Sequence, residues 1–152
     1  MNLVIEEARI GDLNTLVEFQ LKMALETEEL KLDREVLSKG VKAVYADPTK
    51  ARYFIARNED RVLGMLMITL EWSDWRNGWV WWIQSVYVDQ EFRKDGIFRS
   101  LYFHVKNLVI NSENVRGLRL YVDKRNIKAQ KVYEALGMTG EHYSTYEWMK
   151  DN

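Results

Sequence analysis

The sequence predicts an α/β (α+β) fold, with a central, mixed, largely antiparallel sheet of six to seven strands flanked by about four helices. Three observations support this fold class. The first half carries strand-like segments separated by short turns, which favours antiparallel pairing. The second half alternates strand-like and helix-like segments, as in a β-α-β unit. No repeat, low-complexity stretch or linker interrupts the chain, so residues 1–152 are expected to form a single domain.

A strand over residues 3–9 and a helix after it are expected at the start of the chain. Asp12 precedes the helical pattern and can serve as its N-cap. Apolar residues then recur at helical spacing between residues 13 and 24. A second helix is expected over Arg34–Tyr45, and it must end before Pro48, because proline disfavours helical geometry in the residue that precedes it.

The middle of the chain is expected to form a hairpin and a long strand. Residues 53–57 and 62–70 are strand-like and are separated by a turn at residues 58–60. Residues 79–88 form a long strand with apolar residues on both faces, which predicts that helices cover it on both sides. Regular alternation assigns to one face Trp79, Trp81, Ile83, Ser85 and Tyr87.

The remaining elements alternate between helix and strand. A helix begins at Gly96 and carries an apolar stripe to Val109. A short strand is expected over residues 118–122, and a helix over residues 126–136. Residues 138–149 are expected to supply one or two closing strands.

Composition excludes several classes of function. The formal net charge of −1 provides no global attraction to nucleic acid or to an anionic membrane, so neither is expected as a partner. There is no cysteine and there are only two histidines, so no metal site is expected. The N-terminus lacks the pattern of a signal peptide, and no apolar run approaches the ~18 residues of a membrane span. These features predict a soluble, cytoplasmic protein.

The turn between the long strand and the next helix is the clearest candidate for a binding site. A turn of this kind can direct several backbone N–H groups at one point, and the positive end of the helix dipole adds to the attraction for an anion. A diphosphate suits such a site, and Arg93, Lys94 and Arg99 would add charge. Gly96 would let a ligand approach the backbone closely. A solvated loop that binds nothing is the alternative, and a nucleotide P-loop is excluded because its motif is absent.

Two motifs resemble the signatures of the GNAT acetyltransferases. Residues 87–97, YVDQEFRKDGI, are similar to the acetyl-CoA signature [Q/R]-x-x-G-x-[G/A] that follows a strand ending in valine. Residues 126–138, NIKAQKVYEALGM, are similar to the second signature, N-x-x-A-x-x-x-Y-x-x-x-G-[FM]. The expected order of elements also resembles the GNAT fold. The resemblance implies that acetyl-CoA is the acyl donor.

The resemblance also implies roles for individual residues. Main-chain groups of Val86 and Val88 would pair with the pantetheine arm, and amides of residues 93–99 would hold the pyrophosphate. Asn126 would contact the cofactor, and Tyr133 would lie by the thioester sulfur. The implied cofactor-binding set is Val86, Tyr87, Val88, Arg93, Lys94, Asp95, Gly96, Ile97, Phe98, Arg99, Asn126 and Ala129.

The sequence departs from the GNAT pattern at two positions. Phe98 replaces the last small residue of the acetyl-CoA signature, and Lys94 replaces the glycine that commonly follows the arginine. The ring of Phe98 must turn away from the diphosphate, or one amide contact is lost.

Tyr133 is the leading catalytic candidate, as the general acid that protonates the leaving thiolate. Proton transfer from a phenol of pKa ~10 to a thiolate of pKa ~8.5 is uphill by roughly 2 kcal/mol. A core aromatic role for Tyr133 and a purely capping role for Asn126 remain the alternatives. Many relatives carry a glutamate on the strand before the signature, but the corresponding positions here hold Trp82 and Gln84. A base would therefore come from elsewhere, with Glu28, Glu29 and Glu71 as candidates, or the acceptor would need none.

The expected acceptor is a primary amine of a small molecule, cationic or amino-acid-like, which would attack the thioester directly in a ternary complex. Five of the six tryptophans fall within residues 72–82, and those of the loop could contact a ligand, whereas Trp79, Trp81 and Trp82 are expected in the core. The candidate substrate-binding residues are Glu28, Glu29, Glu71, Trp72 and Trp75. A non-catalytic acyl-CoA-binding sensor and a protein-interaction module that uses the Trp-rich loop are the alternatives. A homodimer is also compatible with the resemblance, since GNAT proteins often dimerise.

Overall fold

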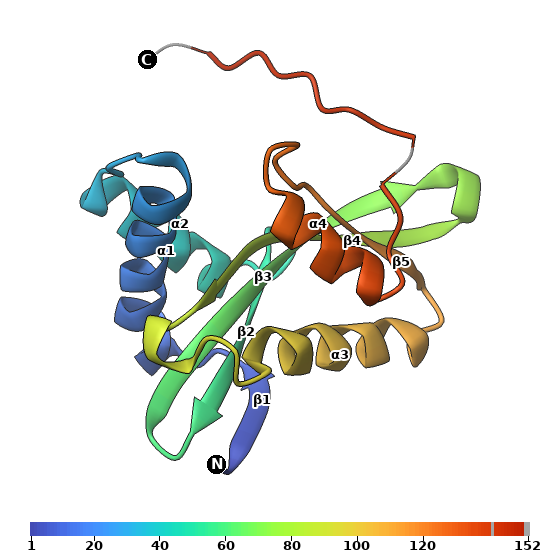
Figure 1. Ribbon diagram of the computed structural model, residues 1–152. Coiled ribbons are helices and arrows are strands. Elements are labelled where there is room, and N and C mark those ends of the chain that lie inside the picture. The colour runs from blue at the N-terminus through green and yellow to red at the C-terminus, as the bar shows by residue number, and fades with distance from the viewer. Residues whose placement is uncertain (141, 151–152) are drawn as a thin grey trace. The chain divides into compact units, whose positions relative to one another are not determined.

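Five strands form one sheet in the order β1-β2-β3-β4-β5 in the computed structural model, which describes residues 1–140 and 142–150 (Figure 1). The strands are β1 Leu3–Glu7, β2 Arg52–Asn58, β3 Arg61–Ser73, β4 Gly78–Val88 and β5 Val115–Leu120. The pairs β1–β2, β2–β3 and β3–β4 are antiparallel. The chain divides into two compact units, Met1–Arg119 and Leu120–Asn152, so that almost the whole sheet belongs to the first unit.

Strand β5 runs parallel to β4. The carbonyl of Asn114, just before β5, accepts a hydrogen bond of 2.8 Å from the amide of Trp79 near the start of β4. Further along both strands, the Arg119 guanidinium lies 5.7 Å from the centre of the Trp82 ring. Because both strands advance in the same direction between these contacts, the sheet is mixed and largely antiparallel, as the sequence predicts.

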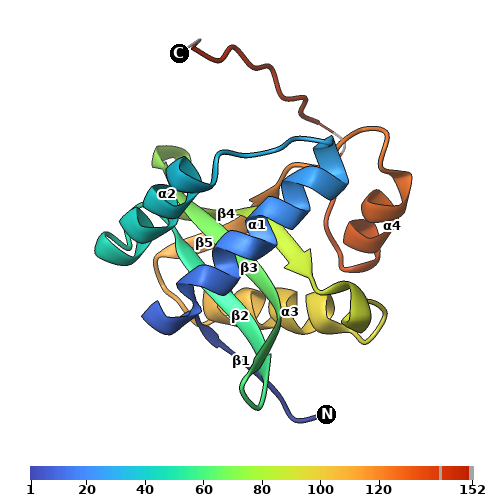
Figure 2. The same cartoon turned by 90° about the vertical axis from the view of Figure 1, so that its left-hand side faces the viewer.

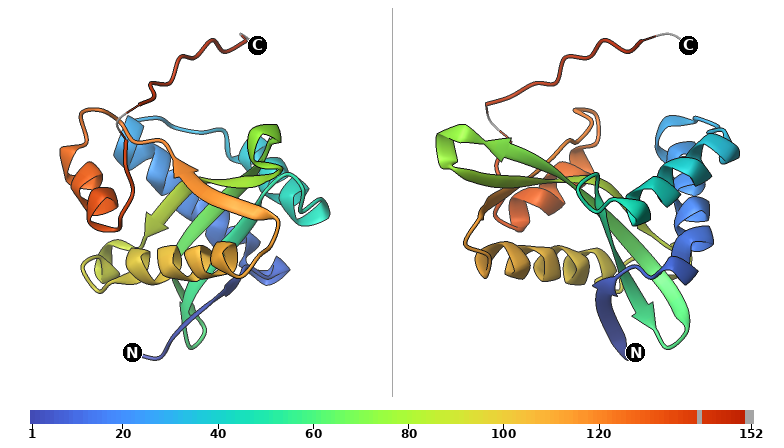
Figure 3. Two further views of the ribbon diagram at one scale, coloured as in Figure 1. Left: turned by 90° about the vertical axis from the view of Figure 1, so that its right-hand side faces the viewer. Right: turned by 180° about the vertical axis from the view of Figure 1, so that it is seen from behind.

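Helices cover both faces of this sheet within the first unit. Helices α1 (Leu13–Glu28) and α2 (Arg34–Ala46) lie on one face, and α3 (Ile97–Ile110) lies on the other (Figures 2 and 3). Helix α4 (Ile127–Ala135) belongs to the second unit. The mixed α/β fold class and the four helices are therefore confirmed. No helix in the described part of the chain is long and apolar enough to cross a membrane.

Each face of the sheet has its own apolar core. On the α1 side, Leu16 and Val17 pack with Ile55 and Met65 of the central strands. On the α3 side, the ring of Phe54 lies 5.7 Å from that of His104. Burial of these side chains on both faces is the main favourable contribution to the stability of the unit.

A β-bulge in β4 overturns the predicted faces of this strand. Met67 pairs with Ser85, but the next residue of β3, Ile68, pairs with Ile83, so Gln84 is an extra residue. The extra residue shifts the alternation by one. Ser85 therefore shares a face with Tyr87 and α1, whereas Ile83 lies on the same face as its partner Ile68, toward α3. The prediction of one regular face from Trp79 to Tyr87 is wrong for this reason.

Three further predictions about local structure are corrected. Strand β5 begins at Val115, three residues before the predicted start. No strand occurs in the described residues 138–140 and 142–149. Within the described part of the chain the sheet therefore has five strands and not the predicted six or seven. Asp12 precedes α1 but its carboxylate does not cap that helix; it accepts hydrogen bonds of 2.9 and 2.8 Å from the guanidinium of Arg57.

Candidate functional site

The link between β4 and α3 is a tightly folded turn of residues 89–96, here named the β4–α3 turn. The Asp89 carboxylate accepts a hydrogen bond of 3.1 Å from the amide of Glu91, which caps a short 3-10 helix over Gln90–Phe92. Lys94 and Gly96 then adopt left-handed conformations, with φ of 80° and 78°. Alternation of left-handed residues with ordinary ones turns successive amides toward a common concavity that suits an anion.

The first amides of α3 complete this concavity. The amide of Ser100 donates to the Gly96 carbonyl at 3.0 Å, which is the first hydrogen bond of the helix. The amides of residues 97–99 come earlier, so the helix itself offers them no acceptor. Gly96, the N-cap of α3, has no side chain that could cap the helix, and a Cβ at this position would meet no atom within 4 Å. Open space and helix-end amides at one point fit a diphosphate group.

Gly64 on β3 explains how α3 can start so close to the sheet. A Cβ at this position would lie 3.0 Å from both the Ile97 Cγ2 atom and the Tyr87 carbonyl oxygen. Glycine therefore lets the first residue of α3 pack directly on the central strands. This contact fixes the start of the helix, and with it the amides that face the turn.

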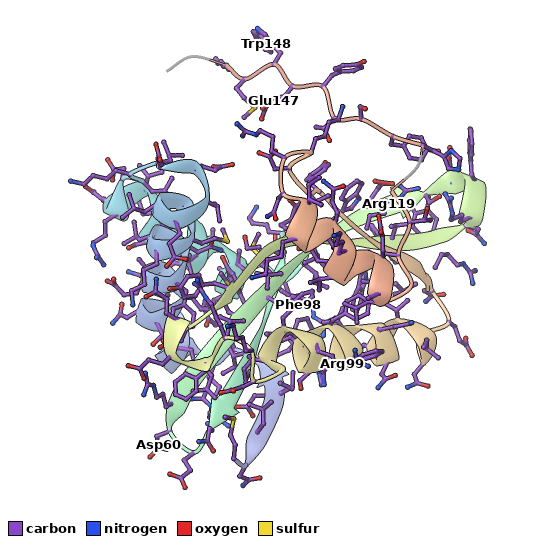
Figure 4. The ribbon with its side chains drawn as sticks, viewed as in Figure 1. Asp60, Phe98, Arg99, Arg119, Glu147 and Trp148 are labelled. Carbon is purple, nitrogen blue, oxygen red and sulfur yellow. The ribbon has the colours of Figure 1, made fainter. Side chains whose placement is uncertain are left out.

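The side chains of the turn contribute less positive charge than the sequence suggests. The Arg93 guanidinium forms an ion pair of 2.7 Å with Glu26 of α1. The Arg99 guanidinium lies 4.9 Å from the centre of the Phe103 ring. Phe98 lies at the start of α3 (Figure 4), and its ring is 6.2 Å from that of Tyr102, one turn further along the helix. An anion held here would depend on backbone amides more than on arginine side chains.

The end of β4 leaves backbone groups for a further partner. Strand β5 has six residues and starts beside Trp79, so as a parallel neighbour it reaches only about as far as Gln84. Beyond that point β4 continues to Val88. Tyr87 is buried toward α1, with its ring 4.9 Å from that of Phe19, and Val86 and Val88 are directed to the opposite face. This stretch matches the position expected to pair with an extended ligand arm.

The candidate residues of the second signature belong to the second unit. Asn126 is the N-cap of α4, and its side-chain carbonyl accepts a hydrogen bond of 3.0 Å from the amide of Ala129. The side-chain NH2 group of Asn126 is a donor that this bond does not use. Tyr133 is half-buried, and burial raises the pKa of its phenol above the usual 10.0. The phenol therefore stays protonated at neutral pH, although the raised pKa also makes it a weaker acid.

The predicted acceptor residues are dispersed over the first unit. Glu28 and Glu29 are exposed at the end of α1. Glu71 accepts hydrogen bonds from the Trp82 indole N–H at 2.8 Å and from Arg119 at 2.9 Å. Both of its oxygens thus contact donors, which disfavours Glu71 as a general base.

Three exposed tryptophans, Trp72, Trp75 and Trp79, lie at the hairpin between β3 and β4. Trp75 is 93% exposed and Trp72 is 51% exposed. The Trp72 ring lies edge-on to that of Trp79, 5.1 Å away. Trp79 itself is 37% exposed, so its predicted place in the core is wrong, whereas Trp81 is buried as predicted. Trp79 is the second residue of β4 and pairs with Trp72, which is itself exposed, so both rings lie near the end of the hairpin.

A hollow of about 400 Å³ lies where α1 is joined to α2. Its apolar lining comes from leucines on the helix and on the connection, and its polar lining from one acid and two bases. The lining residues are Leu21, Leu25, Leu30, Lys31, Leu32, Asp33 and Arg34. Its size is that of a small-molecule site.

Two long-range contacts near these positions are not predicted by the sequence, which indicates for Glu26 only a place in an acidic segment that favours a cationic acceptor. Glu26 binds the side chains of the β4–α3 turn, and Arg119 connects Glu71 to Trp82. Neither contact has a local sequence signal, because the partners are 67 and 48 residues apart in the chain.

Comparison with known proteins identifies the family and the fold of this chain. Residues 16–138 match the family model for the acetyltransferase (GNAT) family. No curated protein matches the chain. Among solved structures, "a possible acetyltransferase from Clostridium difficile 630" is 47% identical, with a TM-score of 0.93 and coverage of 99% of each chain.

Two more distant solved structures share the fold. A transcriptional regulator from Bacillus halodurans C-125 is 21% identical, with a TM-score of 0.82 and coverage of 97% of this chain and 100% of that one. An aminoglycoside acetyltransferase from an uncultured soil metagenomic sample, solved in complex with sisomicin, is 18% identical, with a TM-score of 0.76 and coverage of 99% and 97%. With the family match, the fold and the motifs all in agreement, this chain belongs to the acetyltransferase (GNAT) family and is a GNAT-type N-acetyltransferase.

Proposed function

We propose that this protein moves an acetyl group from acetyl-CoA to a primary amine of a small molecule, by direct attack of the amine in a ternary complex. The observation that carries the proposal is the β4–α3 turn, where the N-terminal end of α3 adjoins the open space at Gly96. Acetyl-CoA, the usual donor in this family, supplies the activated thioester when bound.

The backbone from Arg93 to Arg99 would hold the diphosphate of the donor. Hydrogen bonds to a charged group contribute about 1.5–3 kcal/mol each, so the amides at the start of α3 can account for substantial affinity. The main-chain groups of Val86 and Val88 would align the pantetheine arm as an added strand, because β5 does not reach this part of β4. Lys94 and Arg99 would add charge at the rim.

Tyr133 would act as general acid. Its phenol is held in the protonated form at neutral pH because burial raises its pKa. Donation to the departing sulfur is uphill by more than the roughly 2 kcal/mol that separates an ordinary phenol from an ordinary thiol. Tyr133 would therefore donate its proton as the carbon–sulfur bond breaks and negative charge develops on the sulfur. Asn126 and Ala129, on the same helix, would contact the donor.

The acceptor site would lie in the first unit, close to the end of α1. The leucine-lined hollow of about 400 Å³ suits a small molecule with an apolar portion. Exposed Glu28 and Glu29 nearby in the chain favour a cationic amine. Trp72 and Trp75 lie at the β3–β4 hairpin, outside the lining of this hollow, and are not assigned to it. The aminoglycoside acetyltransferase of the same fold is a precedent for a polyamine acceptor.

The test is release of free thiol from acetyl-CoA in the presence of a panel of amines. We expect turnover with small primary amines and none without an acceptor. Tyr133→Phe should keep the wild-type Kd for CoA and lower kcat by about 10²- to 10⁴-fold, as expected for loss of a general acid. Tyr143→Phe, at a tyrosine that is 90% exposed, is the matched control and should retain full activity. Turnover confined to anionic or uncharged acceptors would contradict the proposed acceptor class, and full activity of Tyr133→Phe would remove Tyr133 from its role.

A further inference from the structure

Three side chains at the end of β4 and in the β4–α3 turn converge on one carboxylate of α1. The Arg93 Nη2 group donates to Glu26 Oε2 at 2.7 Å, and the Gln90 amide donates to Oε1 at 2.9 Å. The Tyr87 hydroxyl donates to the same Oε1 atom at 3.3 Å. Glu26 therefore has donors on both oxygens, all from the segment that precedes α3.

Arg93 connects this carboxylate to the backbone of the turn. Its Nε atom donates to the Val88 carbonyl at 2.9 Å, while its guanidinium lies 5.3 Å from the centre of the Tyr87 ring. One side chain thus holds the last residue of β4 and reaches α1 at the same time. A charge-assisted bond of this geometry is about twice as strong as a neutral one.

The position of this contact matters because the turn is strained. Lys94 follows Arg93 directly and has a positive φ of 80°, a conformation that costs a residue with a side chain roughly 1–2 kcal/mol. A conformation of this cost persists only when the surrounding structure over-determines it. The Arg93–Glu26 ion pair lies immediately before the strained residue, whereas the packing of Ile97 on Gly64 lies immediately after the turn.

We propose that Glu26 is a positioning residue for the cofactor: acting through Arg93, it holds the β4–α3 turn in the conformation that binds the diphosphate. The inference rests on the proposed function, since the turn is taken to be the donor site. It gives Glu26 a role different from the acidic lining of an acceptor site that the neighbouring Glu28 and Glu29 suggest. The Arg93 guanidinium is then a brace for the turn and not a ligand of the anion.

The test compares Glu26→Ala and Glu26→Gln with Glu113→Gln. Glu113 is exposed and lies outside the proposed donor and acceptor sites, so its variant controls for the loss of one negative charge. Calorimetric titration with CoA alone should show a Kd about tenfold higher for Glu26→Ala, a smaller increase for Glu26→Gln, and no change for Glu113→Gln. In turnover assays the KM for acetyl-CoA should rise with Glu26→Ala while kcat at saturation stays within about twofold.

A double-mutant cycle identifies the route of the effect. If Glu26 acts through Arg93, Arg93→Ala should raise the Kd for CoA by a similar factor, and the double variant should be little worse than either single variant. Additive losses would show that Arg93 binds the cofactor directly and would overturn the proposal. A fall in kcat at unchanged KM for Glu26→Ala would also overturn it, because it would place Glu26 in the chemical step.

Amide hydrogen exchange in the ligand-free protein separates this proposal from the proposed function. Glu26→Ala should speed exchange of the amides in residues 93–97 and leave those of β2 unchanged, whether or not CoA binds. If wild-type protein fails to bind CoA, the proposed function is wrong, whereas the exchange result still shows whether Glu26 holds the turn. If the Glu26→Ala protein remains folded and its amides in residues 93–97 exchange at the wild-type rate, the proposal that Glu26 holds the turn is refuted.

Discussion

Replacement of Gly96 by alanine tests the geometry of the β4–α3 turn directly. The residue has a φ of 78°, where a side chain costs roughly 1–2 kcal/mol. Alanine also reduces the freedom of the unfolded chain, which returns about 0.4–1 kcal/mol. A Cβ would meet no protein atom within 4 Å, so a steric clash does not add to the loss of stability. The net loss of stability should be about 1 kcal/mol, or ~2–4 °C in Tm for a protein of this size.

The effect of Gly96→Ala on binding should be much larger than its effect on folding. The open space at Gly96 is where the diphosphate is expected to approach the backbone, so the added methyl group should displace it from at least one amide. Loss of one hydrogen bond to a charged group is worth about 1.5–3 kcal/mol, which corresponds to a Kd for CoA roughly 10- to 100-fold higher. Isothermal titration measures this Kd, and thermal unfolding followed by circular dichroism measures the stability.

Gly137→Ala is the matched control for backbone strain. Gly137 has a φ of 91°, and a Cβ there would likewise meet no atom within 4 Å. It follows α4, where its amide donates to the Glu134 carbonyl at 3.0 Å. Both variants should lose a similar amount of stability, but only Gly96→Ala should lose CoA affinity. A Gly96→Ala protein that is destabilised as expected and still binds CoA with the wild-type Kd would refute the assignment of the turn.

The other predictions concern stability and are measured by urea unfolding. Arg57→Ala should cost about 3–5 kcal/mol, because it leaves the buried carboxylate of Asp12 without its partner; a loss under about 1 kcal/mol would show that the pair adds little. Trp81→Ala should cost about 3–5 kcal/mol and Trp75→Ala less than about 0.5 kcal/mol, since the first ring is buried and the second is 93% exposed; equal losses would contradict this. The Arg93 hydrogen bond holds the pKa of Glu26 below its ordinary 4.5, so this carboxylate stabilises the fold fully above pH 4.5 and loses that effect as the pH falls through its lowered native pKa. The stability difference between wild type and Glu26→Gln should therefore be largest near neutral pH and shrink in acid; a difference independent of pH would exclude an ionic contribution.

The predictable parts of the fold are those that local patterns specify. The helical stripe from residue 13 onward and the glycine at the start of α3 gave boundaries close to those observed, at Leu13 and Ile97. The hairpin turn at residues 58–60 also lies where its polar residues indicate, between β2 and β3. In each case propensity and hydrophobic period point to the same structure.

The unpredicted parts depend on contacts between distant residues. The extra residue at Gln84 is defined only by the pairing of β4 with β3, and nothing in the sequence of β4 marks it. Arg93 was expected to add charge to an anion site, but its partner Glu26 is 67 residues away in the chain. The sequence predicts closing strands after Gly137, but none occurs in residues 138–140 and 142–149, because a strand depends on cross-strand packing and not on propensity alone.

The bulge at Gln84 divides β4 into two segments, one ending at Ile83 and one beginning at Ser85. Side chains alternate regularly between the two faces of the sheet within each segment, but the alternation shifts by one residue at the bulge. Substitution of Gln84 would leave the direction of every other side chain in β4 unchanged. Deletion of Gln84 would remove the bulge, and the side chains of either the tryptophan-bearing segment or the Ser85–Val88 segment would then move to the opposite face of the sheet. Chain length at this position is therefore more constrained than side-chain identity, and substitutions on either side of the bulge keep both faces of β4 only if the number of residues is unchanged.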